Sequence, residues 1–190
     1  MKIGFIGLGN VGGKLAGSLL RNGHDVVVRD LDKSLAQPFI DQGAAWADSP
    51  KEMAQACESV ITCLPSPAAS AAVMEEGDGL LQGLSDGKIW MEMSTTDEAE
   101  VKRLGALVHK AGASAVDCPV SGGCHRADTG NISIFAGCER ETFERIVPIL
   151  KSMGRRLLHT GPLGSASVLK VITNYPVSYT HLTLPTILLV

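Results

Sequence analysis

A glycine pattern near the N-terminus constrains the fold of this chain more than any other feature. Three glycines, Gly7, Gly9 and Gly12, follow the apolar run Ile3–Ile6 directly and precede a helical pattern. In a G-x-G-x-x-G turn the first glycine permits a sharp strand-to-helix turn, the second leaves room for a pyrophosphate, and the third lets the helix pack close to the sheet. The helix N-terminus adds free N–H groups and a positive dipole end. A glycine-rich turn can also serve only to reverse the chain, so the flanking residues decide between the two interpretations.

The flanking residues favour a dinucleotide site. Asp30 follows Gly12 by 18 residues and ends the segment HDVVVRD, which is typical of a second strand. A carboxylate at this place accepts hydrogen bonds from a ribose 2′-hydroxyl and repels a 2′-phosphate, so it favours NAD. Arg29 leaves NADP open, because an arginine can meet a 2′-phosphate. The residues expected to contact the cofactor are Gly7, Leu8, Gly9, Asn10, Val11, Gly12 and Asp30.

The composition excludes several classes of protein. The chain has 190 residues, enough for one sizeable α/β domain, and its net charge is −3 without the basic block that a nucleic-acid partner requires. The five cysteines are odd in number and include no C-x-x-C pair, so neither a disulfide framework nor a metal site is expected. No signal peptide or membrane span is recognisable. We therefore expect a cytoplasmic protein without a membrane partner.

Strand and helix signals alternate along the chain, which predicts an α/β fold of the Rossmann type with a doubly wound, mostly parallel sheet. Strands are expected at Lys2–Ile6, Asp25–Val28, Ala44–Trp46, Ser59–Leu64, Ile89–Met93, Ala115–Asp117, Asn131–Ala136 and Arg156–His159. Helices are expected at Val11–Asn22, Leu31–Gln42, from the Ser49-Pro50 cap onward, at Asp97–Lys110 and at Glu139–Met153.

The C-terminal segment departs from this alternation. A helical pattern begins at Ser165 and is interrupted by Pro176. The next ten residues, VSYTHLTLPT (Val177–Thr186), coincide with a translated reading frame of a transposon-end adapter used in sequencing libraries. A genuine strand-forming tail is the alternative. We expect a dinucleotide-binding domain over residues 1–164, a helical stub over 165–176 and a non-native tail over 177–190.

Four further segments carry a family resemblance over residues 1–174. They are VITCLPSPA (Val60–Ala68), MSTTDEAE (Met93–Glu100), DCPVSGGCHRADTG (Asp117–Gly130) and GPLGSASVLKVITN (Gly161–Asn174). With GLGNVGG, their order and spacing resemble the β-hydroxyacid dehydrogenases, which include 3-hydroxyisobutyrate dehydrogenase and tartronate semialdehyde reductase. The resemblance implies hydride transfer between NAD(P) and a small hydroxyacid or its semialdehyde. It also implies a helical C-terminal domain that is missing here, and a homo-oligomeric full-length parent.

The resemblance also implies roles for loop residues at the carboxyl edge of the sheet. Leu64 and Pro65 would line the cofactor, and Thr95 would lie on its nicotinamide side, while Thr96 is expected to cap the helix that begins at Asp97. The sequence Ser121-Gly122-Gly123 exposes consecutive backbone N–H groups that suit a carboxylate, although an ordinary turn is the alternative. By resemblance Ser121, Gly122 and Gly123 hold the substrate carboxylate, whereas Arg126 receives no role.

Lys170 and Asn174 are four residues apart and therefore share a helix face. A lysine on a helix is usually a solvated charge, but the resemblance implies that Lys170 is catalytic and that Asn174 orients the substrate. A lysine ammonium stabilises a developing alkoxide and passes a proton. Two alternatives remain, a non-catalytic nucleotide-binding or scaffold protein and an imine reductase, and Lys170 argues against both. The truncated chain alone is expected to be inactive.

Overall fold

The computed structural model describes residues 1–175, and within them the strands form one nine-stranded sheet. Six parallel strands come in the order β3-β2-β1-β4-β5-β6. They are β1 (Lys2–Ile6), β2 (Asp25–Arg29), β3 (Ala45–Trp46), β4 (Ser59–Thr62), β5 (Ile89–Glu92) and β6 (Ser114–Asp117). Next to β6 lies β8 (Ile132–Gly137), which is antiparallel to β6 and to β7 (Val120–Ser121) and parallel to β9 (Gly154–Gly161). The predicted doubly wound, mostly parallel sheet is confirmed.

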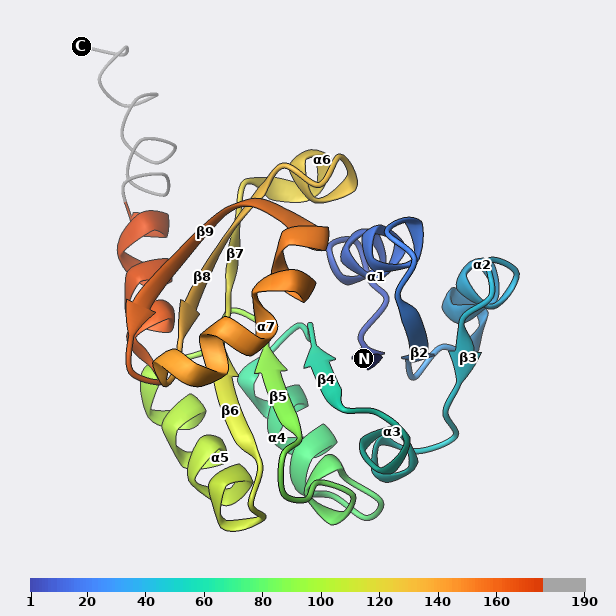
Figure 1. The fold of residues 1–190 in the computed structure, drawn as a ribbon, viewed down its shortest axis with the longest axis horizontal. Coiled ribbons are helices and arrows are strands. Elements are labelled where there is room, and N and C mark those ends of the chain that lie inside the picture. The colour runs from blue at the N-terminus through green and yellow to red at the C-terminus, as the bar shows by residue number, and fades with distance from the viewer. Residues whose placement is uncertain (176–190) are drawn as a thin grey trace, which may run out of the picture.

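Helices cover both faces of this sheet (Figure 1). They are α1 (Gly12–Arg21), α2 (Gln37–Ile40), α3 (Pro50–Ala56), α4 (Pro67–Glu75), α5 (Glu98–Lys110), α6 (Gly123–Asp128) and α7 (Arg140–Met153), with 3₁₀ turns at Lys33–Ala36 and Leu80–Gln82. A further helix occupies residues 165–175.

The parallel strands are buried on both sides, and successive side chains alternate between two hydrophobic cores. In β1, Ile3 and Phe5 pack with α1 and α7, whereas Ile6 packs on the other face with α3, α4 and α5. In β5, Met91 and Trp90 alternate in the same way. This two-sided burial explains why the strands appear in the sequence as continuous apolar runs. It also fixes the carboxyl ends of β1, β2, β4, β5 and β6 along one edge.

One expected helix is replaced by two shorter turns. The segment expected as a helix over Leu31–Gln42 forms a 3₁₀ turn, Lys33–Ala36, followed by the short α2. Asp32 causes the tight turn, because its side chain accepts the Ser34 N–H at 2.9 Å. Pro38 then lies in the first turn of α2, where its missing N–H costs nothing.

Two helices, α4 and α6, were not predicted. Ser66 caps α4 by accepting the Ala69 N–H at 3.2 Å, and Pro67 begins it.

The expected adapter-like tail, Val177–Val190, lies outside the described residues, and the expected division of the chain into three parts stays a prediction.

Candidate cofactor and substrate site

The β1–α1 turn has the geometry that its glycines predict. Gly7 has φ +98°, and a Cβ there would collide with the Cys63 carbonyl oxygen. A Cβ on Gly12 would collide with the carbonyl oxygen of Gly7, so the start of α1 packs directly on the turn. A Cβ on Gly9, by contrast, would have no atom of the described part of the chain within 4 Å. Open space therefore lies beside the exposed Gly9 and Asn10, at the N-terminus of α1.

Asp30 lies against this turn. Its Oδ2 accepts the Leu8 N–H at 2.6 Å, and its Oδ1 accepts the Asp32 N–H at 3.1 Å. The half-buried carboxylate is thus held at the end of β2, beside the glycine turn. Arg29 already donates to the carbonyl oxygens of Ala47 and Asp48, at 3.1 and 2.6 Å.

A chain of hydrogen bonds joins the ends of β4 and β5. The Leu64 N–H donates to Ser94 Oγ at 2.7 Å, and the Ser94 N–H donates to Glu92 Oε1 at 2.8 Å. Glu92 is wholly buried, and this burial raises the pKa of its carboxyl above the ordinary value, although the hydroxyls of Ser94, Ser70 and Thr62 oppose the shift. The Leu64–Pro65 loop and the Ser94–Thr96 loop are therefore held together by a buried acid that the sequence analysis missed. Its signal was one acidic residue within the apolar run IWMEM.

The two threonines of this loop, Thr95 and Thr96, lie in different surroundings. Thr95 is exposed at the edge of the sheet, where a ligand can reach it. Thr96 is buried and does not cap α5, so that prediction is wrong. The cap is Asp97, whose Oδ1 accepts the Glu100 N–H at 2.9 Å. A carboxylate at this position also interacts favourably with the positive end of the helix dipole.

The segment Ser121–Gly123 leads from β7 into α6. Gly122 and Gly123 have φ +133° and +76°, in the region that favours glycine. Ser121 is held by pairing with Ser133 of β8. A Cβ on Gly122 would lie 2.8 Å from Cδ of Arg126, so the Arg126 side chain lies directly on this loop.

A second buried acid, Asp117, fixes the helix that carries the expected catalytic lysine. Asp117 is wholly buried at the end of β6, and its Oδ1 and Oδ2 accept the N–H groups of Gly164 and Ser167 at 2.7 and 2.8 Å. These N–H groups belong to the beginning of helix 165–175, where a carboxylate is favourable. Asp117 precedes Ser121 by only four residues, so it links the Ser121–Gly123 segment to this helix. Asp117 was not among the residues that the sequence predicted for the site.

Lys170 and Asn174 both lie on helix 165–175. Lys170 is half-buried, and this burial lowers the pKa of its ammonium, whereas Asn174 is exposed one turn further on. A lysine with a lowered pKa exchanges its proton closer to neutral pH than a solvated one does. The structure thus places Ser121, Lys170 and Asn174 on two segments that Asp117 joins.

The sheet order and the glycine turn facing Asp30 define a dinucleotide-binding domain of the Rossmann type. Residues 2–161 match the family model described as the NAD binding domain of 6-phosphogluconate dehydrogenase, and the chain belongs to this family. The predicted resemblance to the β-hydroxyacid dehydrogenases is likewise confirmed.

Individual relatives agree with this assignment. "Probable 3-hydroxyisobutyrate dehydrogenase, mitochondrial" of Dictyostelium discoideum is 33% identical over 172 residues, which are 90% of this chain and 54% of the relative. The solved structure of 3-hydroxyisobutyrate dehydrogenase of Mycobacterium tuberculosis with L-serine has a TM-score of 0.90 at 26% identity, over 96% of this chain and 62% of that one. An imine reductase of Myxococcus stipitatus with NAD⁺ also has a TM-score of 0.90, over 98% of this chain and 64% of that one, but at 18% identity it shows the fold alone. The chain spans about half the length of the curated relatives that it matches.

Residues 1–175 lack the features of a metal centre and of a membrane span. No cluster of three or more His, Cys, Asp or Glu side chains there is arranged to hold a metal ion. No helix in the same part of the chain is long and apolar enough to cross a membrane.

Proposed function

We propose that this chain is the cofactor-binding part of an oxidoreductase that transfers a hydride between a nicotinamide cofactor and a small β-hydroxyacid or its semialdehyde. The observation that carries the proposal is the pair of hydrogen bonds that Asp117 accepts from the N–H groups of Gly164 and Ser167, at the start of the helix that carries Lys170. It joins the segment suited to a substrate carboxylate to a half-buried lysine. A protein that only bound a nucleotide would need neither feature.

The cofactor fits the open side of the glycine turn. The pyrophosphate would occupy the space beside Gly9 and meet the N-terminus of α1, where Gly7 to Gly12 present their backbone. Asp30 would accept hydrogen bonds from the ribose hydroxyls. Because a carboxylate repels a 2′-phosphate, we propose NAD in preference to NADP. Leu64, Pro65 and Thr95 would line the nicotinamide end. When bound, the nicotinamide ring supplies or accepts the hydride.

The substrate would lie between the two segments that Asp117 joins. Ser121, Gly122 and Gly123 hold its carboxylate through their hydroxyl and N–H groups. Lys170 stabilises the reacting oxygen and holds or gives up the proton there, because its lowered pKa suits both roles. Asn174 orients the same oxygen. Imine reduction has only a likeness of fold in its favour.

The parent protein is proposed to be cytoplasmic and to assemble as a homo-oligomer. In this chain itself, helix 165–175 carries an apolar surface at which copies can associate, where Val171 and Ile172 are 56% and 59% exposed. Large exposed apolar patches mark association surfaces.

The test of this function is an assay on a chimera, because the chain spans about half the length of its relatives. Joined to the remaining part of a 3-hydroxyisobutyrate dehydrogenase, the chain should form NADH from 3-hydroxyisobutyrate or L-serine. Lys170→Ala should lower kcat by about two orders of magnitude or more while NADH affinity stays within twofold. The exposed Lys110→Ala is the matched control. An active Lys170→Ala chimera would remove the proposed role of Lys170.

A further inference from the structure

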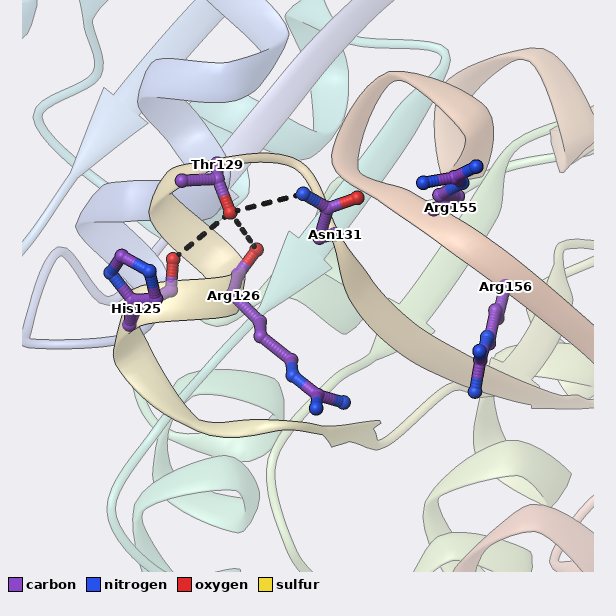
Figure 2. Close-up of a pocket in the computed structure, with 6 residues that line it drawn as sticks. All are labelled: His125, Arg126, Thr129, Asn131, Arg155 and Arg156. Atoms are coloured by element: carbon purple, nitrogen blue, oxygen red, sulfur yellow. Dashed lines mark hydrogen bonds between the residues drawn. The ribbon is translucent and has the colours of Figure 1, made fainter.

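A basic hollow lies between α6 and β9, outside the cofactor site. Its volume is about 610 Å³, and it is lined by His125, Arg126, Thr129, Asn131, Arg155 and Arg156. Figure 2 shows Arg126 extending from α6 and Arg155 and Arg156 from β9, around one opening. No acidic side chain of the described residues 1–175 lines this opening, although acidic residues outnumber Lys and Arg in the chain by 20 to 17.

The three arginines of the hollow differ from the other five in the chain. Each of the others, Arg21, Arg29, Arg103, Arg140 and Arg145, donates at least one hydrogen bond to a protein oxygen. Within residues 1–175, Arg126, Arg155 and Arg156 form neither an ion pair nor a side-chain hydrogen bond. The nearby acid of α6, Asp128, lies 3.7 Å from Lys14 of α1 instead. Gathering three unneutralised guanidinium groups costs electrostatic free energy that a bound anion would offset.

The hollow borders the segment proposed to hold the substrate carboxylate. The Cδ atom of Arg126 lies 2.8 Å from the position of a Cβ on Gly122, so its guanidinium group begins within one side-chain length of that loop. Thr129 fixes the end of α6 beside it, because its hydroxyl donates to the carbonyl oxygen of His125 at 3.1 Å and accepts from Asn131 Nδ2 at 3.4 Å. A ligand held at Ser121–Gly123 can therefore extend a second group into the hollow.

We propose that this hollow is a second anionic subsite, and that the substrate is a β-hydroxyacid carrying a phosphate group in addition to its carboxylate. The inference rests on the proposed function, because it places the carboxylate at Ser121–Gly123. A phosphate suits the hollow better than a second carboxylate does, since its oxygens accept from several guanidinium groups at once.

The experiment compares two ligands that differ only by the phosphate. Binding of D-erythronate and of 4-phospho-D-erythronate to the whole chain is measured by calorimetry at low ionic strength with saturating NAD⁺. The phosphorylated acid should bind at least tenfold more tightly. The double variant Arg126→Gln/Arg156→Gln should lose that advantage, whereas Arg140→Gln, which removes one exposed arginine elsewhere, should keep it. NADH and NADPH affinities of all variants are measured in parallel and should not change.

Each result decides a separate point. If wild-type chain does not bind NADH, the proposed function fails first. If NADH binds but the phosphate gives no advantage, or the double variant keeps the advantage, the subsite is overturned while the proposed function stands. Inorganic phosphate that binds as tightly as 4-phospho-D-erythronate would make the hollow a free anion site and overturn the substrate class. A selective loss of NADPH affinity in the double variant would assign the hollow to a cofactor phosphate, and this result would also overturn the substrate subsite.

Discussion

Three acids at strand ends organise the loops of this site. Asp30 follows β2, Glu92 ends β5 and Asp117 ends β6, and each accepts backbone N–H groups from a loop at the carboxyl edge. The three acids differ in burial, and their roles differ accordingly. Asp30 is half-buried beside the open glycine turn and can meet a ligand, whereas Glu92 and Asp117 are wholly buried and act on the backbone.

At the residue scale, Asp30 should determine which cofactor binds. Asp30→Ala removes the acceptor for the ribose hydroxyls and the charge that repels a 2′-phosphate. NADH affinity should fall about tenfold, which corresponds to the loss of a charged hydrogen bond, and the preference for NADH over NADPH should narrow or reverse. Fluorescence titration of both cofactors measures this. Asp32→Ala, the same change at an exposed residue two positions on, should have little effect. If the ratio of NADH affinity to NADPH affinity is the same in both variants, Asp30 is not part of the site.

Glu92 should make stability depend on pH. Because burial raises its pKa, the folded chain keeps a proton that the unfolded chain has lost, and stability falls as pH rises above about 4.5. The slope is about 1.4 kcal/mol per pH unit until the folded-state pKa is passed. Glu92→Gln cannot titrate, so its free energy of unfolding relative to wild type should increase from pH 4 to pH 8. Urea unfolding across this range is the measurement, and a difference that does not vary with pH would contradict the account.

At the element scale, a Ser-Pro cap predicted α3 but the same signal was overlooked at α4, where Ser66 caps the helix and Pro67 begins it. Ser49-Pro50 marked the start of α3 correctly, and Ser49 Oγ accepts the Glu52 N–H at 3.1 Å. The short helix α6 carries no apolar period, so nothing in its sequence distinguished it from a loop. Asp97 and Thr96 were confused because either side chain can cap a helix, and only burial of Thr96 within the fold decides between them.

Asp117 should stabilise helix 165–175 specifically. Asp117→Ala leaves two buried N–H groups without an acceptor, which costs about 1–3 kcal/mol for each. The amides of Gly164 and Ser167 should then exchange faster in hydrogen-exchange measurements. Asp97→Ala, which removes the exposed cap of α5, should cost only about 1 kcal/mol and leave these two amides unchanged. If the amides of Gly164 and Ser167 exchange at the same rate in Asp117→Ala as in wild type, Asp117 does not hold helix 165–175 in place.

At the scale of the whole molecule, the sequence predicted a doubly wound, mostly parallel sheet but not how its last strands pair. Continuous apolar runs indicate buried parallel strands, yet nothing local specifies that β8 turns antiparallel to β6. The basic hollow was hidden for the same reason, because Arg126 and Arg156 are distant in sequence and meet only when β9 pairs with β8. Long-range pairing also explains why Asp117 was missed, since its partners are Gly164 and Ser167.

The apolar surface of helix 165–175 should make the chain associate. Ile172 is 59% exposed and lies beside Val171 and Val168 on the same helix. Ile172→Lys places a charge on this surface and should shift the chain toward monomer in sedimentation at a given concentration. Leu35→Lys, at a 41% exposed leucine elsewhere, is the control and should leave the sedimentation unchanged. A wild-type chain that stays monomeric at all concentrations would contradict this.

If the open side of the glycine turn binds a nicotinamide dinucleotide, side chains placed at Gly9 should weaken NADH binding, and titration of NADH against Gly9 variants measures that effect. A Cβ on Gly9 would have no atom of residues 1–175 within 4 Å, so Gly9→Asp and Gly9→Asn should unfold at about the same temperature as wild type. Gly9→Asn should weaken NADH binding by bulk alone. Gly9→Asp should weaken it further, by about a hundredfold or more relative to wild type, because its carboxylate also repels the pyrophosphate. Equal NADH affinity in all three folded proteins would show that the dinucleotide does not bind beside Gly9.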